Sequence, residues 1–107
     1  MKEINTYCFD IDGTICTTDC RYHDAEPFND VINHINSLYN EGKQIIMFTS
    51  RGWKSGKDWF KFTRTQLDSW GLKYHKLIMG KVQADIFIDD RGINVNDWCK
   101  KNNIVKK

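Results

Sequence analysis

Two closely spaced pairs of aspartates are the strongest chemical signal in this chain. Asp10 and Asp12 belong to an Asp-Ile-Asp-Gly-Thr run, and Asp89 and Asp90 are adjacent much later in the sequence. Carboxylates gathered in one cleft repel each other, and a hard divalent cation relieves that repulsion. Because oxygen ligands suit Mg²⁺, the sequence predicts a magnesium site formed by these four aspartates.

Hydroxyl, ammonium and backbone N–H groups elsewhere in the chain suit a phosphate. The hydroxyls of Thr49 and Ser50 follow an apolar run, and Lys81 lies just before the apolar run at 86–88. Gly13 and Thr14 are expected to offer backbone N–H groups in a tight loop. Together these groups predict a site that binds a phosphoryl group and stabilises its charge during transfer.

The spacing of Asp10 and Asp12 suggests that the two carboxylates have different catalytic roles. On a continuing strand, side chains two residues apart point to the same side. One carboxylate can then attack phosphorus as a nucleophile. The other can protonate the leaving oxygen and later take a proton from water.

These residues follow short apolar runs that alternate with helical patterns. Apolar side chains recur at steps of three and four after Pro27, and Gly42 ends that helix. We expect strands near 4–9, 45–48, 74–79 and 86–88, and helices at 27–41, 58–70 and 94–101. This order predicts an α/β fold with a mostly parallel sheet covered on both faces. Ligands bind such sheets beyond the carboxyl ends of the strands, where the aspartates and Thr49 are expected.

Four segments, in order, resemble the motifs of the haloacid dehalogenase-like phosphatases. They are Phe-Asp-Ile-Asp-Gly-Thr at 9–14, Phe-Thr-Ser-Arg at 48–51, Lys81, and Ile-Phe-Ile-Asp-Asp at 86–90. The resemblance implies a Rossmann-like three-layer sandwich. Neither 15–48 nor the stretch from Gly52 to Lys81 has room for an inserted cap. We therefore expect one capless domain over residues 1–107, in which the loops at 15–26 and 52–57 or a neighbouring subunit select the substrate.

The same resemblance assigns roles to the motif residues. Asp10 would become an aspartyl-phosphate, and Asp12 would be the general acid and base and give Mg²⁺ its backbone carbonyl. Thr49 and Lys81 would hold the phosphoryl group, with Lys76 as an alternative to Lys81.

Among the later aspartates, Asp89 is expected to bind Mg²⁺ directly, and Asp90 directly or through water. Arg51 has two interpretations: its fork could bind a second anionic group of the substrate, or it could form an ion pair with the aspartates. Gly13, Thr14 and Ser50 complete the expected substrate-binding set.

The expected activity is that of a Mg²⁺-dependent phosphomonoesterase. The short length and the Phe-Thr-Ser-Arg-Gly and Ile-Asp-Asp-Arg-Gly runs are similar to small phosphatases of bacterial capsule and surface polysaccharide biosynthesis. That similarity implies a small phosphorylated metabolite, such as a sugar, polyol or amino-alcohol phosphate. The alternatives are a phosphatase for nucleic-acid ends or phosphoproteins, and a phospho-receiver signalling domain. The receiver fits poorly because the middle strand ends in Thr49 rather than in an aspartate.

Composition limits the remaining classes. A formal net charge of +2 without a basic cluster argues against nucleic-acid binding. The longest apolar runs are far shorter than the ~20 residues of a membrane span. We expect a cytoplasmic protein with free thiols, since no export signal is evident. Because capless relatives often assemble, a homo-oligomer is also a possible state of this protein.

Overall fold

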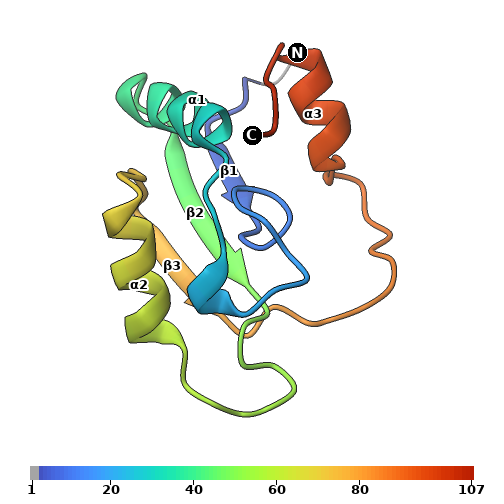
Figure 1. Ribbon diagram of the computed structural model, residues 1–107. Helices are drawn as coiled ribbons and strands as arrows, with labels where there is room; N and C mark the ends of the chain where they lie inside the picture. Colours follow the sequence, from blue (N-terminus) through green and yellow to red (C-terminus); the bar gives the residue numbers. More distant parts are fainter. Residues whose placement is uncertain (1–2) are drawn as a thin grey trace.

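Three parallel strands form the sheet. They are β1 (Thr6–Phe9), β2 (Gln44–Thr49) and β3 (Lys76–Met79), in the order β1-β2-β3. The computed structural model describes residues 3–107. Phe9 is in register with Met47, and Thr49 is in register with Met79. The carboxyl ends of the three strands therefore meet at one edge of the sheet (Figure 1).

The helices form where the apolar period predicts them. They are α1 (Asn29–Asn40), α2 (Phe60–Ser69) and α3 (Val95–Lys101), with a short 3₁₀ helix η1 (Tyr22–Asp24) after β1. The spacing in α1 places Val31, Ile32 and Ile35 on one buried face. Thr63 and Leu67 do the same in α2. Each helix buries one stripe of side chains and exposes the rest.

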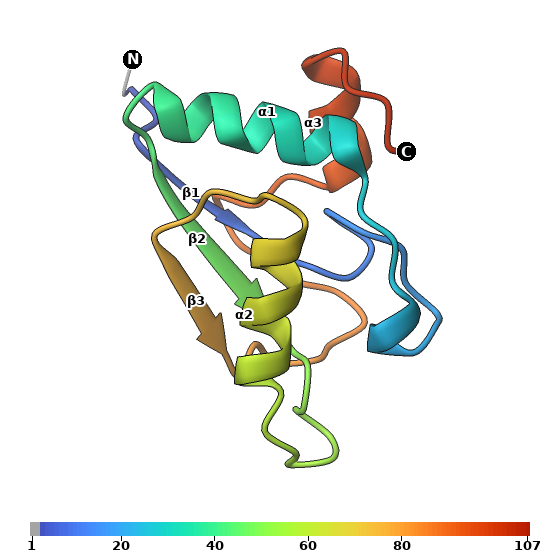
Figure 2. The same cartoon turned by 60° about the vertical axis from the view of Figure 1, so that its left-hand side comes forward.

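Alternate residues of the strands face the helices. Ile45 and Met47 of β2 are fully buried, whereas Ile78 of β3 is 44% exposed and Cys8 of β1 is also exposed. Connections that run in the same direction along a parallel sheet place their helices on the same face, because such crossovers are right-handed. Within residues 3–107 no helix covers the opposite face (Figure 2). The α/β class, the parallel sheet and the lack of a cap agree with the sequence prediction.

The strand expected at 86–88 does not form. Ile86, Phe87 and Ile88 are 73%, 55% and 90% exposed, and β1 pairs with β2 alone in the described part of the chain. Apolar character suggested a buried strand, but a run this short becomes buried only when it pairs with a neighbour. The segment instead passes outside the sheet on its way to α3 (Figure 1).

Within residues 3–107 no helix is long and apolar enough to cross a membrane.

Candidate active site

Asp10 lies directly after β1, at the carboxyl edge of the sheet. Its side chain is 32% exposed, and its Oδ1 lies 3.6 Å from Nζ of Lys81. Partial burial raises the pKa of this carboxyl above its ordinary value. The ammonium of Lys81 and the backbone N–H of Ile11 oppose that rise, and the nearby Asp12 adds to it. Asp10 is thus a carboxylate paired with one flexible cation.

Lys81 reaches this position through a tight connection at the end of β3. Gly80 adopts a φ of +88°, which favours glycine, and the N–H of Lys81 donates to the carbonyl of Thr49 at 3.0 Å. The Lys81 ammonium also lies 5.2 Å from the centre of the Phe87 ring. The alternative, Lys76, begins β3 beside Ile46 and is exposed. The structure therefore brings Lys81, and not Lys76, to Asp10.

A cleft of about 470 Å³ opens beside Asp10 and Lys81. Ser50, Lys54 and Phe87 also contribute to its walls. Lys54 was not singled out by the sequence analysis, although it belongs to the 52–57 loop that was expected to select the substrate. A lysine in a loop following a candidate site is a common surface feature, so sequence alone gave little signal. With Asp85, which also lines it, the cleft combines two carboxylates, one hydroxyl and two ammonium groups.

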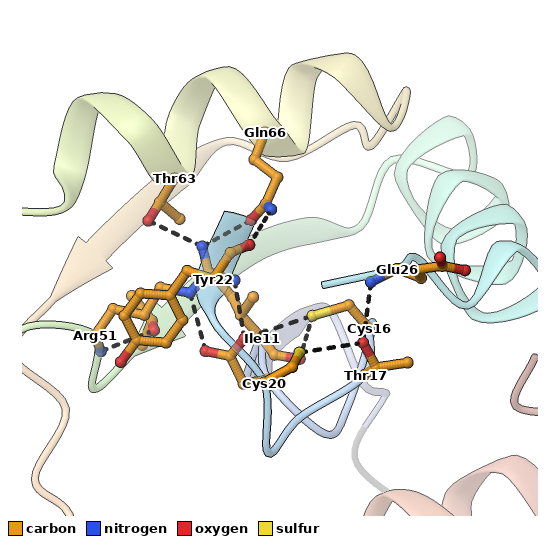
Figure 3. Close-up of polar contacts among 11 residues, drawn as sticks. Ile11, Cys16, Thr17, Cys20, Tyr22, Glu26, Arg51, Thr63 and Gln66 are labelled. Carbon is orange, nitrogen blue, oxygen red and sulfur yellow. Dashed lines mark hydrogen bonds and ion pairs between the residues drawn. The ribbon is translucent and has the colours of Figure 1, made fainter. Parts of the chain in front are cut away.

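Asp12 is held by Arg51 rather than facing open solvent. Nε of Arg51 donates to Oδ2 of Asp12 at 2.9 Å, and Nη2 donates to Oδ1 at 2.8 Å. The Arg51 side chain has no exposed surface, and its Nη1 donates to Thr63 and Gln66 of α2 (Figure 3). The structure thus shows the ion pair. The prediction that Arg51 binds substrate is not met in this arrangement, because its donors face protein.

Three further residues of the expected phosphoryl-binding site have hydrogen-bond partners within the protein. The N–H of Gly13 donates to the carbonyl of Cys16 at 2.9 Å, and that of Thr14 donates to Ile11 at 3.0 Å. The loop after β1 folds back on itself, so these backbone donors are used within it. Their expected contact with phosphate stays a prediction. Thr49 is 1% exposed, and its hydroxyl oxygen accepts the N–H of Arg51 at 3.1 Å.

The second aspartate pair does not join the first. Asp89 and Asp90 lie on the exposed segment, where the Asp89 carboxylate accepts the N–H groups of Arg91 and Gly92 at 2.8 and 2.6 Å. These two hydrogen bonds lower the pKa of Asp89. Across residues 3–107, no three His, Cys, Asp or Glu side chains gather closely enough to hold a metal ion. The predicted four-aspartate cluster is not assembled, because the segment that carries half of it does not pair with β1.

The donors that remain near Asp10 do not fit Mg²⁺ in this arrangement. Both oxygens of Asp12 accept hydrogen bonds from Arg51, and Asp10 is paired with Lys81. A magnesium site here requires further oxygen ligands.

The loops around the site are rich in aromatic side chains. His23 of η1 packs against Trp59 and Phe62, with ring centres 5.8 and 4.6 Å apart. Trp53 is 49% exposed and lines a second, smaller hollow of about 220 Å³ with Trp59. His23 thus has a packing role, and Trp53 presents a ring to solvent near Arg51.

The comparisons with known proteins support the fold and do not identify a family. No family model matches the sequence, and no curated protein matches it. A solved structure of a target from Vibrio cholerae is similar, with a TM-score of 0.80 and 20% sequence identity. The match covers 89% of this chain and 87% of that chain. At this identity the likeness shows the fold alone, since one fold hosts many activities.

Proposed function

We propose that this chain is a phosphomonoesterase of the haloacid dehalogenase-like type, with Asp10 as its nucleophile. The observation that carries the proposal is the pairing of a partly buried Asp10 with Lys81 at 3.6 Å in an open cleft. A carboxylate oxygen of Asp10 attacks phosphorus, the bond from phosphorus to the leaving oxygen breaks, and the leaving oxygen takes a proton from Asp12. Lys81 balances charge on the phosphoryl oxygens. Water then attacks the aspartyl-phosphate, and Asp12 accepts the proton of that water.

The cleft offers cationic and hydroxyl contacts to an anionic substrate. Lys54 and Lys81 both line it opposite the carboxylates of Asp10 and Asp85, and Ser50 adds a hydroxyl. The volume of about 470 Å³ suits a small phosphorylated metabolite. We propose a sugar, polyol or amino-alcohol monophosphate, as the similarity to capsule polysaccharide phosphatases implies. A macromolecular phosphate is the second candidate, because the cleft is open and none of the described residues 3–107 forms a cap over it.

Magnesium belongs to the proposal through the motif resemblance. When bound, Mg²⁺ would supply charge neutralisation at the phosphoryl group. The described arrangement does not form its site, so the mechanism assigns no step to it. Assays with added Mg²⁺ and with a chelator test this requirement directly.

The deciding experiment is phosphate release from a panel of small monophosphates and an end-phosphorylated oligonucleotide. Asp10→Asn serves as the blank, since an amide does not attack phosphorus. We expect turnover of a small phosphate, loss in Asp10→Asn, and acid-stable capture of the phosphorylated wild-type protein. Turnover that survives in Asp10→Asn would overturn the mechanism. Lasting phosphorylation without turnover would favour a receiver role, and a strong preference for the oligonucleotide would favour the macromolecular substrate.

A further inference from the structure

The Arg51 guanidinium is the most completely engaged charged group of the described chain. Its side chain is fully buried, and four hydrogen bonds leave from it. Two of them form a fork on the Asp12 carboxylate, which fixes both the distance and the plane of that group. A single ammonium would fix neither, since it acts as a point charge.

Two side chains of α2 hold the guanidinium from behind. Nη1 of Arg51 donates to Oε1 of Gln66 at 2.7 Å and to Oγ1 of Thr63 at 3.2 Å. Gln66 also donates from Nε2 to the carbonyl of Tyr22 at 2.7 Å. The Tyr22 ring in turn stacks on the guanidinium, with 4.5 Å between the ring centre and Cζ of Arg51 (Figure 3). The network therefore locks the orientation of Asp12 to α2 and to the loop after β1.

The hydrogen bonds on Asp12 leave room for a transferred proton. Each carboxylate oxygen has two acceptor positions, and Arg51 uses one on each oxygen. The Cys16 thiol also donates to Oδ1 at 3.6 Å. One acceptor position on Oδ2 therefore remains, which is what a base needs in order to accept a proton from water.

We propose that Arg51 is a positioning residue that holds Asp12 as the general base for hydrolysis of phosphorylated Asp10. This inference rests on the proposed function. In the step concerned, the oxygen of water bonds to phosphorus and the bond from phosphorus to the Asp10 oxygen breaks. The proton of water passes to Asp12, and free phosphate and the Asp10 carboxylate are the products.

The substrate for the test is 4-nitrophenyl phosphate. Nitrophenolate leaves without a proton, so formation of the aspartyl-phosphate does not depend on Asp12, whereas its hydrolysis does. Arg51→Lys keeps the charge and removes the fork, and Gln66→Met removes the support while Arg51 remains. Thr65→Ala is the matched control on α2, because the Thr65 hydroxyl bonds only to the carbonyl of Lys61. Thermal unfolding shows that each variant is folded.

We expect kcat to fall about 10- to 100-fold in Arg51→Lys, within the range of general base catalysis. KM should fall in parallel, so that kcat/KM changes by less than about threefold, because only the second step slows. Rapid mixing should show a burst of nitrophenolate at the wild-type rate, followed by slower turnover. Gln66→Met should show the same pattern more weakly, and Thr65→Ala should behave as the wild type.

An Asp12→Asn background supplies the second readout. There, Arg51→Lys should cause no further loss of kcat, because its effect acts through Asp12. A fall in kcat/KM without a burst, or equal losses in both backgrounds, would overturn the inference while the phosphatase stands. If Arg51→Lys does not fold, the burst in Gln66→Met decides. Absence of any aspartyl-phosphate in the wild type would refute the proposed function itself.

Discussion

Replacing Lys81 by methionine tests whether the positive charge beside Asp10 stabilises a bound phosphoryl group. The ammonium lies 3.6 Å from Asp10 Oδ1, and the two side chains are 26% and 32% exposed. Coulomb attraction at this distance is about 1 kcal/mol in water and about 5 kcal/mol at an effective dielectric of 20. Exposure to solvent favours the lower part of that range. A bound phosphoryl dianion would meet the same ammonium, so its loss should cost about 1.5–3 kcal/mol.

That cost corresponds to a fall of about 10- to 150-fold in kcat/KM for Lys81→Met. The acid limb of the pH profile should also move to higher pH, because Lys81 now opposes the burial that raises the pKa of Asp10. The assay is phosphate release at substrate concentrations well below KM, from about pH 4 to 8.

Lys76→Met is the matched control, since Lys76 is an exposed lysine at the opposite end of β3. It should leave kcat/KM and the pH profile unchanged. Equal losses in both variants would show that general surface charge, and not the contact with Asp10, attracts the substrate. An unchanged rate in Lys81→Met would refute the assignment of the phosphoryl site.

Two predictions concern stability. Burial raises the pKa of Asp10, so this group favours the folded state below the ordinary carboxyl pKa, and that contribution is lost as pH rises through the folded pKa. Asp10→Asn should therefore stabilise the protein at pH 7 by about 0.5–1 kcal/mol. This gain should vanish below about pH 4. If the unfolding temperatures of the variant and the wild type differ by the same amount at pH 7 and below pH 4, the prediction is contradicted. Gly52 has a φ of +85°, and a Cβ there would collide with the carbonyl oxygen of Lys57. Gly52→Ala should cost about 2–4 kcal/mol, against about 1–2 kcal/mol for Gly56→Ala, whose Cβ would meet open space. Urea unfolding compares the two, and equal losses would mean that the loop adjusts.

Local patterns were sufficient to predict the three strands and the neighbourhood of Asp10. Helical periodicity identified α1, and the carboxyl-end rule for parallel sheets placed Asp10 and Ser50 at one cleft. These features depend on spacing within one element or on the direction of the strands. Both are properties that a single sequence contains.

Long-range choices between partners were not predictable in the same way. The sequence offered Arg51 two acceptors, an anionic group of the substrate or the aspartates. The contact of Arg51 with Gln66 of α2 is a long-range feature that accompanies the ion pair with Asp12. The backbone donors of Gly13 and Thr14 are used inside their own loop. The run at 86–88 has strand character, but pairing requires a neighbour as well as apolar residues. In each case the outcome depends on the competition of distant groups.

The unpaired outer edge of β1 and the open run at 86–88 have a consequence for solubility. An exposed strand edge and an apolar β-prone run are the two surfaces from which chains stack on one another. Asp85 precedes the run, and Asp89 and Asp90 follow it. Such flanking charges act as gatekeepers, because stacked chains would bring like charges together. Near neutral pH, the same aspartates keep neighbouring molecules apart.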